Sequence, residues 1–287
     1  MFNVTNNFGL GGNLSVSAKG NMLVDGGRVL TRTLGRADAG TLTVNAGNLT
    51  LINGGQIFVG IGNASQNPPG FAEGTGKGGN VAIRVDDTLS ISGTDVEGFQ
   101  SGIFSNAQIG KGDTGNVSVS AAKLHISNGG AISADTHSSG NSGNLQIKAS
   151  DLFLSGTGLN GLSRISADAV STEANEGITG DAGNITINVD RLEMQDSAQL
   201  STSTSTSGRG GNLTVIASED IRIIRSPAER VQTGLFSNSN ESGQGGNLTI
   251  SAGGSTVVEG GRILTRTLGK ADAGILAVKA KNLTLSE

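Results

Sequence analysis

Four polar residues follow short strand-like segments at one repeated position and could do acid–base or metal chemistry. They are Asn106, Asp135, Asp168 and Ser203, and His137 lies two residues beyond Asp135. When consecutive repeats are aligned these four share one register, so Asp135 and Asp168 are expected to be near neighbours. Neighbouring carboxylates can bind a cation or act as general acid and base. Catalysis, weak cation binding and a solvated pair all remain open for Asp135 and Asp168.

A catalytic site would need more groups than this pair supplies. A polysaccharide lyase or hydrolase on such a scaffold would want a third acidic group, a basic residue across a groove and usually aromatic sugar platforms. The sequence has neither Trp nor Tyr. We therefore predict no catalytic set, no enzyme activity and no cofactor, and Asp135 and Asp168 stay the candidates for binding a metal. Lyase or hydrolase action on extracellular glycans is the alternative function.

A second acidic set lies two residues before a recurring Gly. It consists of Asp38, Asp113, Asp181 and Asp272. Carboxylates of this kind could be calcium ligands. Other repeats carry Lys, Arg, Asn or Gln there, so no continuous acidic row exists. Local Asx turns, in which the carboxylate accepts from nearby backbone, are the simpler expectation.

The element that must position these residues is a repeat built on a Gly followed by alternating apolar residues. Positions two, four and six after the Gly are aliphatic in all copies, which indicates a strand with one buried face. The shortest spacing between copies, 28 residues, occurs four times, and longer spacings are this unit plus insertions. Nine copies begin near residues 12, 40, 79, 115, 143, 183, 211, 246 and 274.

Each unit contains two further short alternating segments, and none shows a helical period. Three short strands repeated with one polarity predict an all-β, right-handed parallel β-helix with three sheets and about nine coils. At about 4.8 Å per coil, the rod would be on the order of 40 Å long. We treat residues 1–287 as one β-helix domain, with a partial coil at 1–11.

The Asn after the recurring Gly is present in seven of the nine copies. We interpret these residues as a structural ladder at an inside corner, where stacked amides bond one another and the turn backbone. A ligand-binding amide row is the functional alternative. The ladder consists of Asn13, Asn80, Asn116, Asn144, Asn184, Asn212 and Asn247.

Composition limits the partners. The net charge of −4 gives no electrostatic support for nucleic-acid binding. Cys is absent, which excludes disulfides and thiol chemistry. No apolar run reaches the length of a membrane span, so no membrane insertion is expected. The first residues have neither a basic region nor an apolar core, unlike a signal peptide.

The repeats resemble those of filamentous-haemagglutinin-type exoproteins, the secreted partners of two-partner secretion systems, and the cyanobacterial members in particular. The segment Gly-Gly-Asn-Leu-Thr-Ile-Ser-Ala at 245–252 carries this resemblance, together with 260–263 and 282–285. The resemblance implies an adhesin-like rod on the bacterial cell surface or outside the cell. It also implies export through an outer-membrane transporter of the TpsB type. The family's secretion domain, with its Asn-Pro-rich motifs, is not visible in this sequence.

A long-range duplication supports a longer array. Residues 26–51 match 260–285 at 20 of 26 positions, an offset of seven units. On this basis we expect the chain to be an excerpt of a longer array. The strands are nearly generic, so we expect any binding to an unknown surface, glycan or matrix ligand to be carried by the insertions at 60–78 and 170–181.

Overall fold

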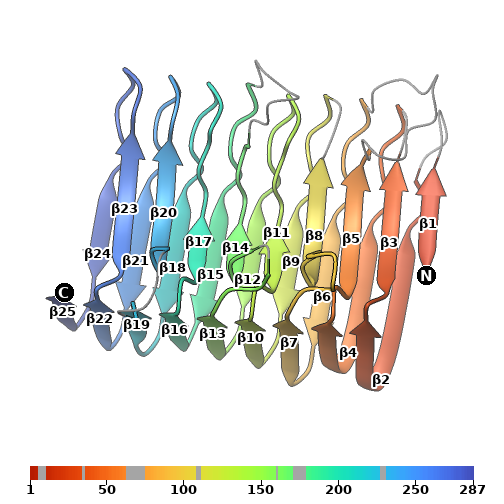
Figure 1. Cartoon of the computed structure of the whole chain (residues 1–287), viewed down its shortest axis with the longest axis horizontal. Helices are drawn as coiled ribbons and strands as arrows, with labels where there is room; N and C mark the ends of the chain where they lie inside the picture. The colour runs from red at the N-terminus through yellow and green to blue at the C-terminus, as the bar shows by residue number, and fades with distance from the viewer. Residues whose placement is uncertain are drawn as a thin grey trace.

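The computed structural model describes residues 1–5, 11–33, 36–62, 75–107, 111–159, 161–170, 179–226 and 231–287. These residues form 25 β-strands and no helix. The strand pairs are parallel, and the coils stack side by side into a parallel β-solenoid (Figure 1). The predicted all-β solenoid with three strand positions per coil is therefore confirmed. No helix long and apolar enough to cross a bilayer occurs among the described residues.

The first strand of each coil begins two residues after the recurring Gly, where the aliphatic alternation begins. In β6 this alternation buries Val81, Ile83 and Val85 and leaves Ala82 and Arg84 outside. The first row consists of β2 (Leu14–Asp25), β4 (Leu42–Ile52), β6 (Val81–Val85), β9 (Val117–Ser120), β12 (Leu145–Lys148), β15 (Ile185–Val189), β18 (Leu213–Ala217), β21 (Leu248–Ala252) and β24 (Leu276–Lys279).

The second row follows after a corner. Its strands alternate in the same way, as in β10, where Leu124 and Ile126 are buried and His125 is exposed. The row consists of the distal halves of β2 and β4, followed by β7 (Thr88–Ser92), β10 (Lys123–Ser127), β13 (Asp151–Ser155), β16 (Arg191–Gln195), β19 (Ile221–Ile224), β22 (Ser255–Glu259) and β25 (Asn282–Ser286).

The third row makes a separate sheet of nine strands in consecutive order. Its outer face carries the side chains that matter for the candidate site. The row consists of β1 (Phe2–Thr5), β3 (Arg28–Thr33), β5 (Gln56–Ile61), β8 (Gly102–Ala107), β11 (Ala131–Ser133), β14 (Arg164–Ser166), β17 (Gln199–Ser201), β20 (Gly234–Ser239) and β23 (Arg262–Thr267).

The expectation of three separate sheets is wrong in one respect. The first and second rows are joined into a single sheet of sixteen strands. The join is made by β2 and β4, which run unbroken through the corner that bends the chain in later coils. Within β4, Leu42 to Ala46 pair with β6 and Leu49 to Ile52 pair with β7.

The core is a narrow stack of aliphatic side chains. Leu145, Ile147, Leu152 and Ile165 are at most 1% exposed, and each lies over its equivalent in the neighbouring coils. Each buried methylene contributes about 0.8 kcal/mol. Because the core of each coil packs on those of its two neighbours, stability grows with the number of coils, as in other solenoids.

The recurring Gly is required by the close approach of successive coils. A Cβ built on Gly183 would overlap the carbonyl oxygen of Gly143 in the preceding coil and lie 2.7 Å from its carbonyl carbon. Gly211 is in the same position relative to Gly183. The turn therefore has room for hydrogen alone at this position.

Candidate functional site

The seven Asn form a hydrogen-bonded ladder on the outside of the solenoid. Each side-chain Oδ1 accepts a hydrogen bond of 2.8–3.0 Å from the backbone N–H one coil further on. Two of the seven backbone donors belong to Thr41 and Ile275, which stand where the other copies have Asn. All seven side chains are exposed, so the expected inside corner is wrong. The Oδ1 atoms serve the backbone, which gives the ladder an architectural role.

A second ladder runs two residues before the recurring Gly. Asp38, Asp113 and Asp181 accept from backbone N–H groups of the next coil at 2.7–2.8 Å, and Asn141 does so at 2.9 Å. These bonds join coils, so the expected local Asx turns are wrong for these three carboxylates. Among the described residues, no group of three or more His, Cys, Asp or Glu could hold a metal ion.

The column of Asp135 and Asp168 is a third ladder, at the end of the third-row strands. Isolated parallel bridges place these two residues in one register with Asn106, Ser203 and Asn238. Asp135 Oδ1 accepts from the backbone N–H of Asp168 at 2.8 Å, and Asp168 Oδ1 accepts from that of Ser203 at 2.7 Å. The structure thus brings the two predicted carboxylates together.

Buried polar groups surround Asp135. It is 1% exposed, and its Oδ2 accepts from Ser166 Oγ at 2.9 Å and lies 3.4 Å from the guanidinium of Arg164. Asp168 Oδ1 also accepts from Ser201 Oγ at 2.7 Å. The oxygens of Asp135 are therefore occupied by protein donors, which leaves Asp168 as the member of the pair better placed for chemistry.

The protonation of this column is set by burial. Burial, together with the negative charge of Asp135, raises the pKa of Asp168 to about 7, although the bond from Ser201 opposes the rise. Burial also lowers the pKa of His137, which the charge of Asp135 partly offsets. Asp168 therefore exchanges its proton near neutral pH, where a general acid or base is most effective.

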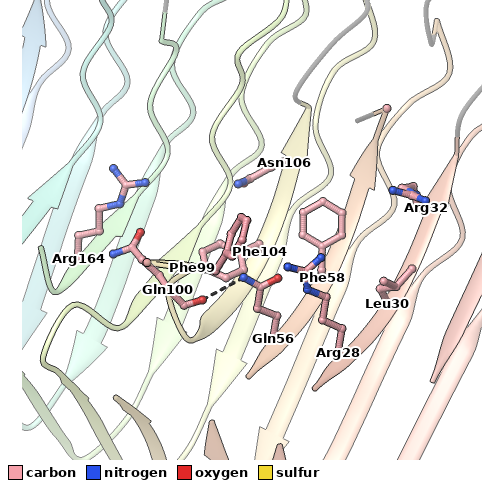
Figure 2. Close-up of a pocket in the computed structure, with 12 residues that line it drawn as sticks. Arg28, Leu30, Arg32, Gln56, Phe58, Phe99, Gln100, Phe104, Asn106 and Arg164 are labelled. Atoms are coloured by element: carbon pink, nitrogen blue, oxygen red, sulfur yellow. Dashed lines mark hydrogen bonds between the residues drawn. The ribbon is translucent and has the colours of Figure 1, made fainter. Parts of the chain in front are cut away.

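A groove lies beside this column on the outer face of the nine-stranded sheet. It encloses about 290 Å³, and half of the residues that line it are Arg or Phe, three of each. We call it the Arg–Phe groove; its principal residues are Arg28, Arg32, Phe58, Phe99, Phe104 and Arg164 (Figure 2). No carboxylate lines it among the described residues, although the whole chain is negatively charged.

The strand register explains why these side chains converge. Outward-pointing residues of neighbouring strands lie side by side, which places Arg28 beside Gln56 and Leu30 beside Phe58. On the next strand Phe104 follows Phe58. Arg28, Leu30 and Arg32 alternate with buried residues along β3 and so share the outer face. Period two, repeated across adjacent coils, builds the floor of the groove.

The insertion between β7 and β8, residues 93–101, forms one wall. Asp95 Oδ1 accepts from the backbone N–H of Phe99 at 2.8 Å and from that of Glu97 at 2.9 Å, which holds the tip in a tight turn. This turn brings the Phe99 ring to 5.4 Å from the guanidinium carbon of Arg28. Such a cation–π contact contributes roughly 0.5–1 kcal/mol at exposed sites.

Gln100 ties this wall to the rest of the solenoid. Its Nε2 donates to the carbonyl oxygens of Gly129 at 2.6 Å and Leu162 at 3.2 Å. The backbone carbonyl oxygen of Gln100 accepts a hydrogen bond from Gln56 Nε2 at 3.0 Å, the bond drawn in Figure 2. The wall is thereby fixed to the floor and to the loop of a later coil, so the groove is formed in advance of any ligand.

The groove continues toward the carboxylates. A second cavity of about 220 Å³ shares Gln100 and Arg164 with the first and is also lined by Asp168, Gln199 and Ser201. Together the two cavities follow the outer face from β3 to β17. The carboxylate column and the Arg–Phe groove are therefore neighbouring parts of one surface.

The sequence analysis did not predict the groove, although the repeat register already aligns the large outward side chains of its floor. Phe58 and Phe104 occupy the same outward position in successive third strands, and Leu30 occupies it in the strand before. The insertions expected to bind ligands, 60–78 and 170–181, lie mostly outside the described residues. The shorter insertion at 93–101 is described, and it builds the wall.

Comparison with known proteins adds no relative. The chain matches no protein-family model, and no curated protein and no solved structure shows significant similarity to it. The class that the fold defines is a parallel β-solenoid.

Proposed function

We propose that the chain is a non-enzymatic, adhesin-like rod segment of a secreted cell-surface exoprotein, and that it binds its ligand in the Arg–Phe groove. The observation that carries this proposal is the groove itself, with three Arg and three Phe side chains on a preformed surface. Ligand sites typically combine apolar walls with a few convergent polar groups. The repetitive strands supply the rigid support for it.

Export and location follow from the repeat resemblance. Under this proposal the rod leaves the cell through an outer-membrane transporter of the TpsB type and acts outside the cell. A chain without Cys suits export in an extended form, because it needs no disulfide for stability. Stacked coils then supply the folding free energy as each coil is added.

The alternative, a glycan lyase or hydrolase, has one observation in its favour. Asp168 has a pKa of about 7 and lines the smaller cavity beside Arg164. Against this, Asp135 is buried and bonded on both oxygens, and the described residues supply no third carboxylate to the cluster. A binding function needs none of these groups to be reactive, and so we favour it.

The test is a binding screen of the purified chain against immobilised neutral and acidic polysaccharides. We expect retention on at least one polymer, and loss of retention in the double variant Phe58→Ala and Phe99→Ala. Phe153→Ala is the matched control, because Phe153 is an outward-facing ring on the second row, against His125. Retention unchanged in the double variant, or cleavage of the polymer, would contradict the proposal.

A further inference from the structure

We infer that the ligand of the Arg–Phe groove is an acidic saccharide, with its carboxylate between Arg28 and Arg32 and its ring against Phe58 and Phe99. This inference rests on the proposed binding function and names the class of ligand. It depends on charge, ring faces, amide groups and the shape of the groove.

The charge of the groove calls for an anion. Three guanidinium groups line it, and Arg28 makes no ion pair among the described residues. Burial and, to a smaller extent, the nearby charge of Arg28 lower the pKa of Arg32, which places the two guanidinium groups near each other on this face. A carboxylate can bind between them. The planar fork of guanidinium matches a carboxylate in two parallel hydrogen bonds.

Arg164 marks the far end of the positive surface. Its guanidinium is paired with Asp135 at 3.4 Å, while its Nε is buried and has no hydrogen-bond partner among the described residues. The Arg164 side chain is 36% exposed and lines both cavities, so a ligand oxygen at their junction would meet the exposed part of its guanidinium.

The aromatic and amide groups favour a sugar over a simple anion. Phe58 is half-buried in the floor and Phe99 is 48% exposed, so both present ring surface to the groove. Aromatic faces carry partial negative charge that attracts the polarised C–H groups of a sugar ring. Gln56, Gln100 and Asn106 supply amide groups that can bond hydroxyls.

The shape favours one unit of a chain. At about 290 Å³ the groove is at the small end of ligand pockets, which suits one saccharide ring and its linkages. The adjoining cavity is lined by Asp168, Gln199 and Ser201, so the next unit along the sheet would turn hydroxyl groups, not its carboxylate, toward Asp168. A linear uronide lying across the third-row strands fits both cavities.

The experiment compares three tetrasaccharides by isothermal titration calorimetry: tetragalacturonate, its fully methyl-esterified form and neutral maltotetraose. We expect tetragalacturonate to bind at least tenfold more tightly than either of the others. Arg28→Ala should weaken its binding at least tenfold. Arg262→Ala is the matched control, because Arg262 occupies the same outward position seven coils away and does not line the groove.

Each other outcome overturns the inference in a distinguishable way. Equal binding of the acid and its methyl ester would overturn it, and the proposed function would stand if the Phe58 and Phe99 double variant lost that binding. An equal loss in Arg28→Ala and Arg262→Ala would mean nonspecific attraction to positive charge. No binding of any tetrasaccharide would also overturn the inference, and the screen of polymers would then decide the proposed function separately.

Discussion

Replacing Gly183 by Ala tests whether the close approach of coils holds the rod together. The new Cβ would lie 2.7 Å from the carbonyl carbon of Gly143, whereas carbon atoms in contact are about 3.5–4.0 Å apart. Gly183 does not have a positive φ, so the backbone conformation suits Ala and the conflict is purely steric. We therefore expect the two coils to separate locally by about 1 Å.

The expected cost follows from the bonds that such a shift breaks. The N–H of Leu145 donates to Asn184 O at 2.8 Å, and the N–H of Asn184 donates to Asn144 Oδ1 at 3.0 Å. Lengthening both by about 1 Å takes them beyond hydrogen-bond range. Two lost bonds cost about 1 kcal/mol each, and overpacking adds about 1–3 kcal/mol. The free energy of unfolding should fall by about 3–5 kcal/mol.

The assay is urea unfolding followed by far-ultraviolet circular dichroism, together with hydrogen exchange of the Leu145 amide. Gly20→Ala is the control, because a Cβ there would meet nothing within 4 Å. That variant should unfold within about 0.5 kcal/mol of the wild type. If the two variants had the same urea midpoint, and Leu145 exchanged at the wild-type rate in both, the steric argument would be refuted.

Three further predictions concern the ladders and the groove. The raised pKa of Asp168 means that the folded state binds a proton that the unfolded state has lost, so stability should fall as the pH rises from about 4 to about 7. Asp168→Asn should therefore gain stability relative to the wild type over that range. Urea midpoints of the variant and the wild type that change equally with pH would contradict this. Asn144→Ala should lose about 0.5–1.5 kcal/mol of unfolding free energy, whereas Gln146→Ala, on the exposed face of strand β12 in the same coil and outside the ladder, should change it little; equal losses would argue against the ladder. Binding of tetragalacturonate should weaken as salt rises from 0.05 to about 0.5 M because exposed charges are screened, and salt-independent affinity would exclude Arg28 as the anchor.

The fold could be predicted because its signals are local and repeated. Alternating aliphatic residues after each recurring Gly reveal the buried face, and the common unit fixes which residues pair between coils. The repeat unit also predicts correctly that Asp135 and Asp168 lie side by side on neighbouring coils. The merging of two rows was not predictable, because it depends on β2 and β4 each continuing as one strand, with a register shift between Ala18 and Asn21, through a corner that separates two strands in later coils.

The groove could not be predicted from the repeat alone. Its floor follows from register, but its wall depends on the turn at Asp95 and on Gln100 reaching carbonyl groups of later coils. Such contacts join residues 29 and 62 positions apart in the sequence. The Asn ladder illustrates the same limit in part: its bonds to backbone N–H groups were expected, but its place on the outside of the solenoid, instead of at an inside corner, was not.

The most direct test of the central claim is a crystal structure of the chain soaked with tetragalacturonate. The account predicts a uronate ring on Phe58, with its carboxylate within hydrogen-bond distance of Arg28 and the chain extending toward Gln199. A saccharide bound elsewhere on the solenoid, with the Arg–Phe groove empty, would contradict it.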